Sequence, residues 1–202
     1  MRINAYIDGF NLYHSILKLN DSSLKWLNLR SLCEKFLKQK DTLNEVYFFT
    51  APATHIQDKL TRHYNYTKAL KTIGVTTIQG KFKKKFPKCK NCGGIYQTYE
   101  EKQSDINLAI QLLSDAYCDK FDTAFLVTAD TDFVSVVKMI KRIFLNKRVI
   151  LLIPPKRENL AHELIKNVDF SFEIKKSHIK NSLLPDEIYF DDKIIKKPSI
   201  YN

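Results

Sequence analysis

The feature that most constrains this chain is a short apolar run that ends in two aspartates. Residues 124–127 (AFLV) are typical of a buried strand in a parallel sheet. A turn of small residues carrying Asp130 and Asp132 follows, and the segment after it has apolar residues at helical spacing. Both acids therefore lie at the carboxyl end of a strand, where open α/β sheets place their sites. A simpler interpretation, that Asp132 only caps the helix, explains one aspartate but not both.

Strand and helix patterns alternate along most of the chain. Strands are expected at residues 3–7, 46–50, 75–78, 124–127, 148–153 and 170–174, and helices at 10–19, 27–37, 57–73, 104–116, 133–144 and 158–165. Strands separated by helices of this length pair in parallel through right-handed crossovers. The sequence therefore predicts an α/β fold, a three-layer α/β/α sandwich with a mainly parallel, Rossmann-like sheet. The predicted domain is residues 1–175, with a Lys-rich loop inserted at about 80–101, and a polar tail of residues 176–202 packs on the body or mediates contacts.

The familiar ligand motifs of such sandwiches are missing from the sequence. Its five glycines form neither a dinucleotide-binding fingerprint nor a P-loop, and there is no nucleophile elbow. Polar residues stand at element ends instead: Asp8 closes the first strand, Asn11 follows one turn later, and Asp105 opens a long helix. If the carboxyl ends of the strands lie side by side, three or four carboxylates converge in one cleft.

Converging carboxylates repel one another unless a cation lies between them. Hard oxygen ligands suit Mg²⁺ or Mn²⁺, with water and a substrate phosphate completing the coordination shell. Taken singly, Asp8 could be a turn residue, Asn11 a helix cap and Asp105 a first-turn acid that interacts with the helix dipole. Together, the acids at the predicted element ends favour a metal site, whereas Asp115 and Asp122 are expected to be solvated.

The net charge is +11, from 33 Lys and Arg against 22 Asp and Glu. An excess of this size favours polyanionic partners, nucleic acid first and an anionic membrane surface second. A membrane partner is not expected, because no apolar run is long enough to span a bilayer and no basic amphipathic helix stands beside an apolar anchor. The N-terminus does not resemble a signal peptide, so we expect a cytoplasmic protein with reduced cysteines.

Three segments, in this order, resemble the NYN domain: YIDGFNLYHS, KQSDINLAIQLL and FLVTADTDFVSVVK. This is a PIN-like ribonuclease fold that depends on Mg²⁺ or Mn²⁺, and the likeness is to a bacterial subgroup once catalogued as a domain of unknown function. The resemblance implies that the metal ligands are Asp8, Asp105, Asp130 and Asp132. It also implies that Asn11 and Thr128 are polar partners that orient water, substrate or a carboxylate. Ala129 stands where many relatives have glycine, so the turn is expected to be less free.

The inserted loop contains a CxxC pair, Cys89 and Cys92, followed by two glycines, which is the shape of a zinc knuckle. A structural Zn²⁺ needs four ligands, and the sequence has no second CxxC or CxxH. Cys33 and Cys118 are expected to be core residues. The pair could therefore share an ion with a second copy of the chain, which would make a homodimer, or it could bind nothing.

The same loop interleaves lysines with two phenylalanines. Lysines neutralise phosphates and aromatic faces stack on unpaired bases, which predicts a flap that contacts single-stranded or looped RNA. The alternative is a solvated charged loop with two buried phenylalanines. The expected RNA-binding residues are Lys81, Lys83, Lys84, Lys85, Lys88, Phe82 and Phe86.

These features predict a metal-dependent endoribonuclease in which a bound water attacks the phosphodiester and leaves a 5′-phosphate and a 3′-hydroxyl. Two other functions remain open. A non-catalytic RNA-binding or regulatory protein would bind RNA without turnover. A small-molecule phosphatase would use the same acids on free phosphomonoesters.

Overall fold

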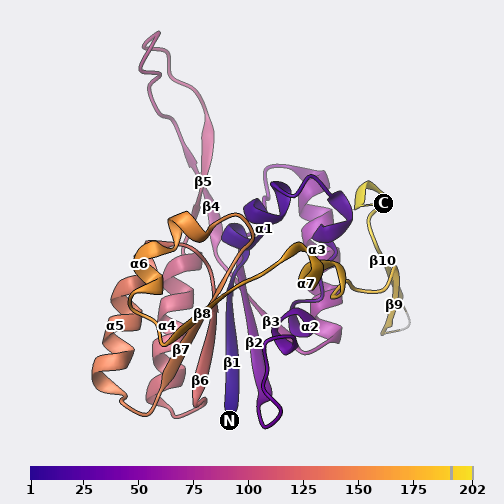
Figure 1. Ribbon diagram of the computed structural model, residues 1–202. Helices are drawn as coiled ribbons and strands as arrows, with labels where there is room; N and C mark the ends of the chain where they lie inside the picture. The colour runs from indigo at the N-terminus through magenta and orange to yellow at the C-terminus, as the bar shows by residue number, and fades with distance from the viewer. Residues whose placement is uncertain (192, 202) are drawn as a thin grey trace.

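The computed structural model describes residues 1–191 and 193–201, so Asp192 and Asn202 of the predicted tail lie outside the described residues. Its centre is a six-stranded sheet in which every pair of neighbouring strands is parallel. The strand order is β3-β2-β1-β6-β7-β8 (Figure 1). The strands are β1 (Arg2–Asp8), β2 (Thr42–Thr50), β3 (Val75–Gln79), β6 (Thr123–Val127), β7 (Arg148–Ile153) and β8 (Phe170–Glu173). The predicted α/β fold is confirmed.

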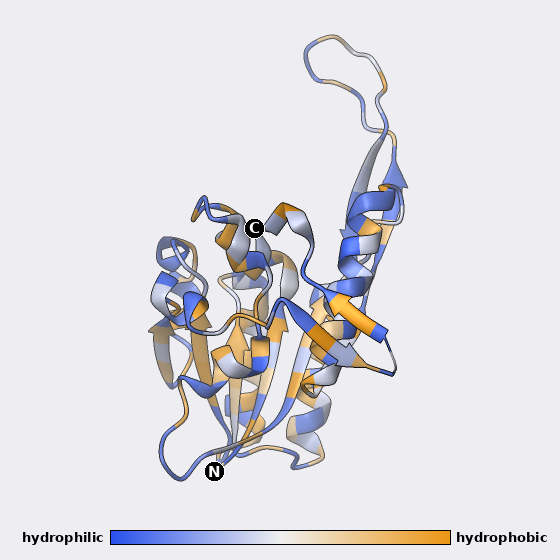
Figure 2. Ribbon diagram, turned by 90° about the vertical axis from the view of Figure 1, so that its right-hand side faces the viewer, coloured by the Kyte–Doolittle hydropathy of each residue, from blue (hydrophilic) through white to orange (hydrophobic). Residues whose placement is uncertain are grey.

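Helices cover both faces of the sheet, because the strands are apolar on both sides (Figure 2). Ile3, Ala5 and Ile7 of β1 belong to the core on one face, whereas Tyr6 belongs to the core on the other. The first face is covered by α1 (Gly9–Leu17), α2 (Leu29–Glu34), α3 (Gln57–Thr72) and α7 (Lys176–Lys180), and the second by α4 (Ser104–Tyr117), α5 (Val134–Ile143) and α6 (His162–Ile165). None of the described helices has the length and apolar character that crossing a bilayer would need.

The predicted inserted loop is an antiparallel hairpin of β4 (Lys81–Lys85) and β5 (Thr98–Lys102). It projects from the body at the carboxyl end of the parallel strands (Figure 1). Glu100 forms ion pairs with Lys85 and with Lys102, the second at 2.9 Å. The pair with Lys85 offsets part of the like charge that the sequence places on β4.

The chain after β8 packs against the body. Ile179, Leu184 and Ile195 join the core that β1 shares with α1 and α3. The indole nitrogen of Trp26 donates a hydrogen bond to the carbonyl of Pro185 at 2.9 Å. This segment also holds a small antiparallel sheet of β9 (Glu187–Phe190) and β10 (Lys193–Lys196). The remaining described helical turns are the 3₁₀ helices η1 (Ser22–Lys25), η2 (Thr131–Phe133), η3 (Glu158–Leu160) and η4 (Ser199–Tyr201).

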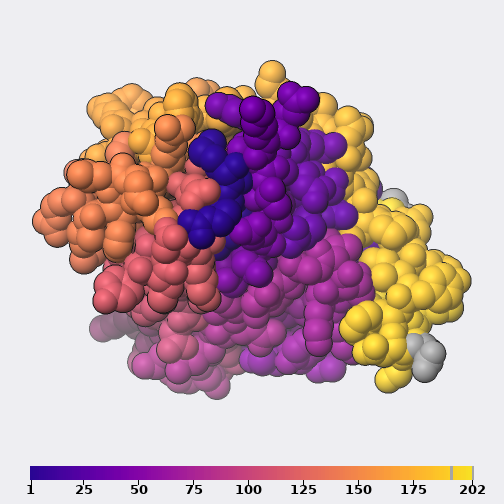
Figure 3. Space-filling model, turned by 90° about the horizontal axis from the view of Figure 1, so that it is seen from below, coloured from indigo at the N-terminus to yellow at the C-terminus, as the bar shows by residue number. Residues whose placement is uncertain are grey.

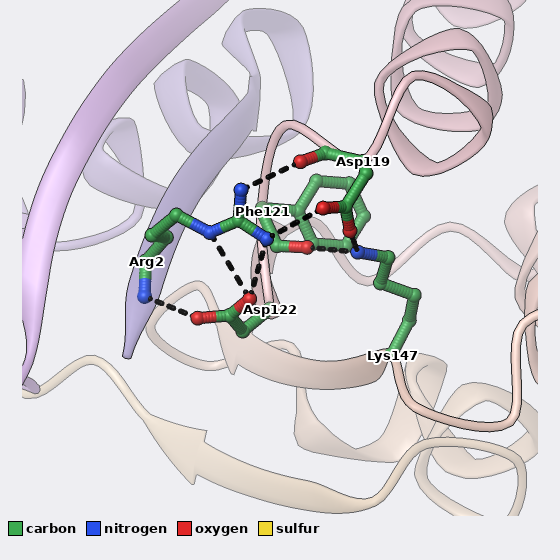
Figure 4. Close-up of polar contacts among 5 residues, drawn as sticks. All are labelled: Arg2, Asp119, Phe121, Asp122 and Lys147. Atoms are coloured by element: carbon green, nitrogen blue, oxygen red, sulfur yellow. Dashed lines mark hydrogen bonds and ion pairs between the residues drawn. The ribbon is translucent and has the colours of Figure 1, made fainter.

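Ion pairs hold the amino ends of the central strands, opposite the projecting hairpin. The first residues of the chain lie at the centre of this end (Figure 3). Arg2 donates to Asp122 at 2.7 Å and to Asp119 at 3.1 Å, and Lys147 also pairs with Asp119 (Figure 4). The hydrogen bonds from Arg2 hold the pKa of Asp122 below its usual range. Asp122, expected to be solvated, has a side chain that is 37% exposed, and it is also paired with Arg2.

Candidate acidic site at the carboxyl end of the sheet

The site is built where the neighbouring strands β1 and β6 end. Ile7 lies beside Val127 in the parallel register, so Asp8 and Thr128 leave the sheet side by side. The Thr128 hydroxyl donates to Asp8 Oδ2 at 2.8 Å and accepts from the backbone N–H of Asp130 at 3.1 Å. Because Asp8 and Thr128 are both buried, this hydroxyl fixes one carboxylate and the turn that carries the next.

Asp8 also begins α1. Its Oδ1 accepts from the backbone N–H of Asn11 at 2.9 Å, so the residue is a helix cap as well as an acid of the site. The helix can start directly at the strand end because of Gly9. A Cβ atom there would lie 2.5 Å from the Phe49 carbonyl oxygen and 2.7 Å from the ring of Phe48.

The second turn holds Asp130 and Asp132. Asp130 caps η2 by accepting from the backbone N–H of Asp132 at 3.0 Å. The simpler interpretation, in which Asp132 is the cap, is therefore wrong, and the side chain of Asp132 is exposed. Ala129 does not have a positive φ angle, so this turn does not require the glycine that the resemblance suggested.

Asp105 reaches the site from the first turn of α4. The residue before the helix, Gln103, has a left-handed backbone with φ of 82°, which turns the chain sharply from β5 into α4. Glu101, at the end of β5, accepts hydrogen bonds from the backbone N–H of Ser104 at 3.1 Å and from its hydroxyl at 2.5 Å. A Cβ atom on Gly80 would lie 2.9 Å from the same Glu101 oxygen, so glycine lets the base of the hairpin close.

The carboxylates of this cleft raise one another's pKa. Burial raises the pKa of Asp8, hydrogen bonds from Asn11 and Thr128 oppose that rise, and the charges of Asp130 and Glu101 add to it. Desolvation raises the pKa of Asp105 to about 6, together with the charges of Asp8, Glu101, Asp130 and Asp132. The four acids predicted from the sequence therefore lie near enough to one another to interact.

Glu101 is a fifth acid of this cluster, and the sequence interpretation missed it. Its charge contributes to the raised pKa values of both Asp8 and Asp105. The residue lies in the run Glu100–Glu101–Lys102, at the end of the segment for which the sequence predicts an inserted loop. The available signal was its position, four residues before Asp105. The hydrogen bonds from Ser104 show that Glu101 points back to the body, whereas Glu100 pairs with lysines of the hairpin.

The residues present suit a hard divalent cation in their chemistry. Among residues 1–191 and 193–201, no group of three or more His, Cys, Asp or Glu side chains is arranged to hold a metal ion. The donor set is nevertheless one of carboxylate oxygens with uncompensated negative charge. Asn11 adds a buried Oδ1 for which the described residues supply no hydrogen-bond partner. A cation near the carboxylates would offset their repulsion.

The hairpin residues expected to bind RNA point in different directions. Phe82 packs against Phe10, with ring centroids 5.9 Å apart, and is partly buried. Phe86 is 61% exposed and lies 5.1 Å from the ammonium group of Lys84. The alternative with two buried phenylalanines is therefore wrong for Phe86. Lys81, Lys83, Lys84, Lys85 and Lys88 are all exposed, and of these five Lys85 is paired with Glu100.

The CxxC pair lies at the tip of the hairpin. Cys89 donates its N–H to the Gly94 carbonyl at 2.7 Å, and its carbonyl accepts from Gly93 at 3.0 Å. Backbone hydrogen bonds from Cys92 and Asn91 hold the pKa of the Cys89 thiol below its usual value. Cys33 is buried as expected, but Cys118 is exposed, so its assignment to the core was wrong.

Comparison with known proteins places these features in a family. The chain is 28% identical, over 91% of its own length and 69% of the relative's, to 6-hydroxy-3-succinoylpyridine 3-monooxygenase HspA of Pseudomonas putida. It shares its fold, with a TM-score of 0.57 and 18% identity, with the crystal structure of a protein of unknown function from Vibrio parahaemolyticus; the match covers 91% of this chain and 96% of that one. Residues 2–175 match the NYN domain. The chain therefore belongs to the NYN domain family, which implies a nuclease-type function related to RNA.

Proposed function

We propose that this protein is a metal-dependent endoribonuclease that cleaves single-stranded RNA in the cytoplasm. The observation that carries the proposal is the cluster of five carboxylates at the ends of β1, β5 and β6 and the start of α4. Desolvation and the charges of the other four acids raise the pKa of Asp105 to about 6. A protein of net charge +11 with an acidic cleft combines attraction for RNA with the ligands of a divalent ion.

Asp8, Asp105, Asp130 and Asp132 would hold Mg²⁺ or Mn²⁺, with Glu101 beside them. When bound, such an ion supplies an activated water and stabilises the leaving oxygen, which yields a 5′-phosphate and a 3′-hydroxyl. Asp8 is the fixed member, because Thr128 and the Asn11 N–H hold both of its oxygens. Asp105 and Asp132 are exposed, so their side chains can rotate toward an ion that approaches with the substrate.

The hairpin would hold the RNA strand over this cleft. Its exposed lysines neutralise phosphates, and the exposed ring of Phe86 offers a surface on which an unpaired base can stack. The tip would extend this role if Cys89 and Cys92 bound Zn²⁺. The described chain supplies only these two sulfur ligands there, so a tetrahedral site would need a second copy of the protein.

Two other classes of function compete with this proposal. A binding protein that kept the fold would bind RNA without cutting it, and a phosphatase would hydrolyse free phosphomonoesters at the same acids. The relative from Pseudomonas putida is named for the oxidation of a pyridine, which is a different chemistry. The acid cluster favours hydrolysis over oxidation, because its donors are those of a Mg²⁺ or Mn²⁺ site. The net charge of +11 favours a polyanionic substrate over a free phosphomonoester.

The test is cleavage of an end-labelled single-stranded RNA by the purified protein with Mn²⁺, Mg²⁺ or EDTA. The variant for comparison is Asp130→Asn/Asp132→Asn. Asparagine keeps the capping hydrogen bond to the N–H at position 132 and removes only charge. We expect cleavage that requires the metal and falls at least a hundredfold in the variant.

A matched control is Glu45→Gln/Asp58→Asn, which removes two exposed carboxylates elsewhere on the surface. Equal cleavage by the wild type and the acid-site variant would identify a contaminating nuclease and reject the proposal. RNA binding without cleavage by any form would favour the binding protein. Hydrolysis of p-nitrophenyl phosphate, but not of RNA, would favour the phosphatase.

A further inference from the structure

A pocket of about 310 Å³ lies beside the acidic cleft, on the face of the sheet covered by α1 and α3. It is lined by residues of α1, α2, β2, α3 and β4 together with η1, η4 and the segments that follow η1 and β2. This volume is at the lower end of the range of small-molecule sites in proteins. None of the functions that the sequence predicted makes use of it.

The charge of the pocket is the reverse of the charge of the cleft. None of its lining residues is acidic, and Lys25, Lys59 and Arg62 are all basic. Within residues 1–191 and 193–201, none of these three forms an ion pair with a carboxylate. Basic side chains gathered around a concave surface without acids suit an anionic ligand.

The walls of the pocket are aromatic. Phe10, Phe48, Tyr66 and Phe82 contribute rings, and the ring of Tyr66 is held in place by a hydrogen bond from its hydroxyl to the Leu27 carbonyl at 2.8 Å. Rings of this kind stack on planar heterocycles such as nucleobases.

His63 is a polar residue in the lining of the pocket. Its Nε2 is buried and has no hydrogen-bond partner among the described residues, so a turn of the ring toward the pocket would bring an unsatisfied polar atom to a ligand. Burial lowers the pKa of this histidine, so the ring is neutral at neutral pH. A neutral imidazole presents one donor and one acceptor, and either suits a polar edge of a heterocycle.

Three residues of the pocket lining, Gly9, Phe10 and Phe82, lie next to acids of the cleft. Phe10 follows Asp8 by two residues in the first turn of α1. Phe82 lies opposite Glu101 in the register of the hairpin and contacts the edge of Phe10. These two rings therefore separate the basic pocket from the acidic cleft, and adjacent parts of one strand can reach both.

We propose that this pocket binds one nucleotide of the RNA, with its base among the aromatic rings and its phosphate at Lys59 and Arg62. This inference rests on the proposed function and adds a subsite to it, one that holds the nucleotide next to the bond facing the acids. The ligand combines a planar heterocycle with an anion, and the pocket supplies partners for both.

The test is calorimetric titration of nucleoside 5′-monophosphates into the protein in EDTA, beside ribose 5-phosphate and pyridine-3-carboxylate. We expect the nucleotides to bind at least tenfold more tightly than ribose 5-phosphate, which lacks the base. The Lys59→Gln/Arg62→Gln variant should lose at least tenfold in affinity, because bonds to a charged phosphate disappear. Lys138→Gln/Arg142→Gln removes the same charge from exposed positions of α5 and should bind as the wild type does.

Equal weakening in both double variants would show that the nucleotides bind only through net charge and would overturn the proposal. Binding of pyridine-3-carboxylate without nucleotide binding would also overturn it, in favour of a free aromatic acid. As a check that does not depend on a variant, the ring nitrogen signals of His63 should shift when the wild type binds a nucleotide. The titration needs no metal or cleavage, so a failure of this subsite is separate from a failure of the nuclease reaction.

Discussion

Replacing Asp105 with asparagine should stabilise the metal-free protein at neutral pH. The pKa of this carboxyl is raised to about 6 by desolvation and by four neighbouring acids. A carboxyl whose folded-state pKa lies above its unfolded value favours the folded protein when protonated. The stabilisation by the protonated carboxyl is fully present below about pH 4 and is lost as the pH rises through about 6. At pH 7 the side chain is ionised, and its negative charge destabilises the folded protein.

The size of the effect follows from the same pKa. A rise from 3.8 to about 6 corresponds to about 3 kcal/mol when solvent does not screen the charges. Because the side chain is exposed, screening reduces this figure, and we expect the free energy of unfolding to increase by about 1 kcal/mol at pH 8. In a chain of 202 residues that gain raises Tm by about 3 °C.

The assay is urea denaturation in EDTA at pH 8 and at pH 4.5, with Glu45→Gln as the matched control. Glu45 is an exposed acid on β2, and its loss should change stability by less than about 0.5 kcal/mol. The gain from Asp105→Asn should shrink at pH 4.5, where the wild-type side chain is largely protonated. A variant that is less stable than the wild type at pH 8, or a gain that does not depend on pH, would refute the proposed crowding of carboxylates.

Three further results are expected. Thr128→Val removes the buried hydroxyl that joins Asp8 to the Asp130 N–H. It should lower the free energy of unfolding, measured in urea, by about 2 kcal/mol and reduce the rate of RNA cleavage at least tenfold. An unchanged stability and cleavage rate would contradict the positioning role of Thr128. The Mn²⁺ concentration for half-maximal cleavage should rise about tenfold per pH unit below pH 6, because protons compete with the ion at Asp105; a flat profile would exclude this carboxyl as a ligand. Lys83→Gln/Lys84→Gln should weaken the binding of single-stranded RNA. The slope of log affinity against log salt concentration should become shallower by about 1.4, at about 0.7 for each lost phosphate contact, and an unchanged slope would place these lysines away from the RNA.

Much of the fold could be predicted because the apolar patterns record which local segments are buried. The strands that end at Asp8 and near Asp130 were recognised from short apolar runs closed by polar turns. Parallel strands share one carboxyl edge, so the position of these acids followed without knowledge of the strand order. The hairpin was missed because its strands are charged on both faces and bury little, which leaves no apolar alternation to detect.

Contacts between distant segments were decided only by the tertiary structure. Asp115, expected to be solvated, is buried and accepts a hydrogen bond from the Tyr6 hydroxyl at 2.8 Å. Glu101 joins the acid cluster because β5 pairs with β4 at the edge of the site. Such partners lie tens of residues apart, and the sequence does not record which of two neighbouring acids faces the body.

The sequence by itself determined the class of fold, the edge of the sheet that carries the acids, and the residue types that suit a hard cation. These three properties can be read from the periodicity and composition of short segments, so they do not depend on contacts between distant residues. The tertiary structure decided the bond from Thr128 to Asp8, the raised pKa of Asp105 and the basic pocket beside the cleft. Each of these depends on the distance between side chains from different elements, which is fixed only when the layers pack.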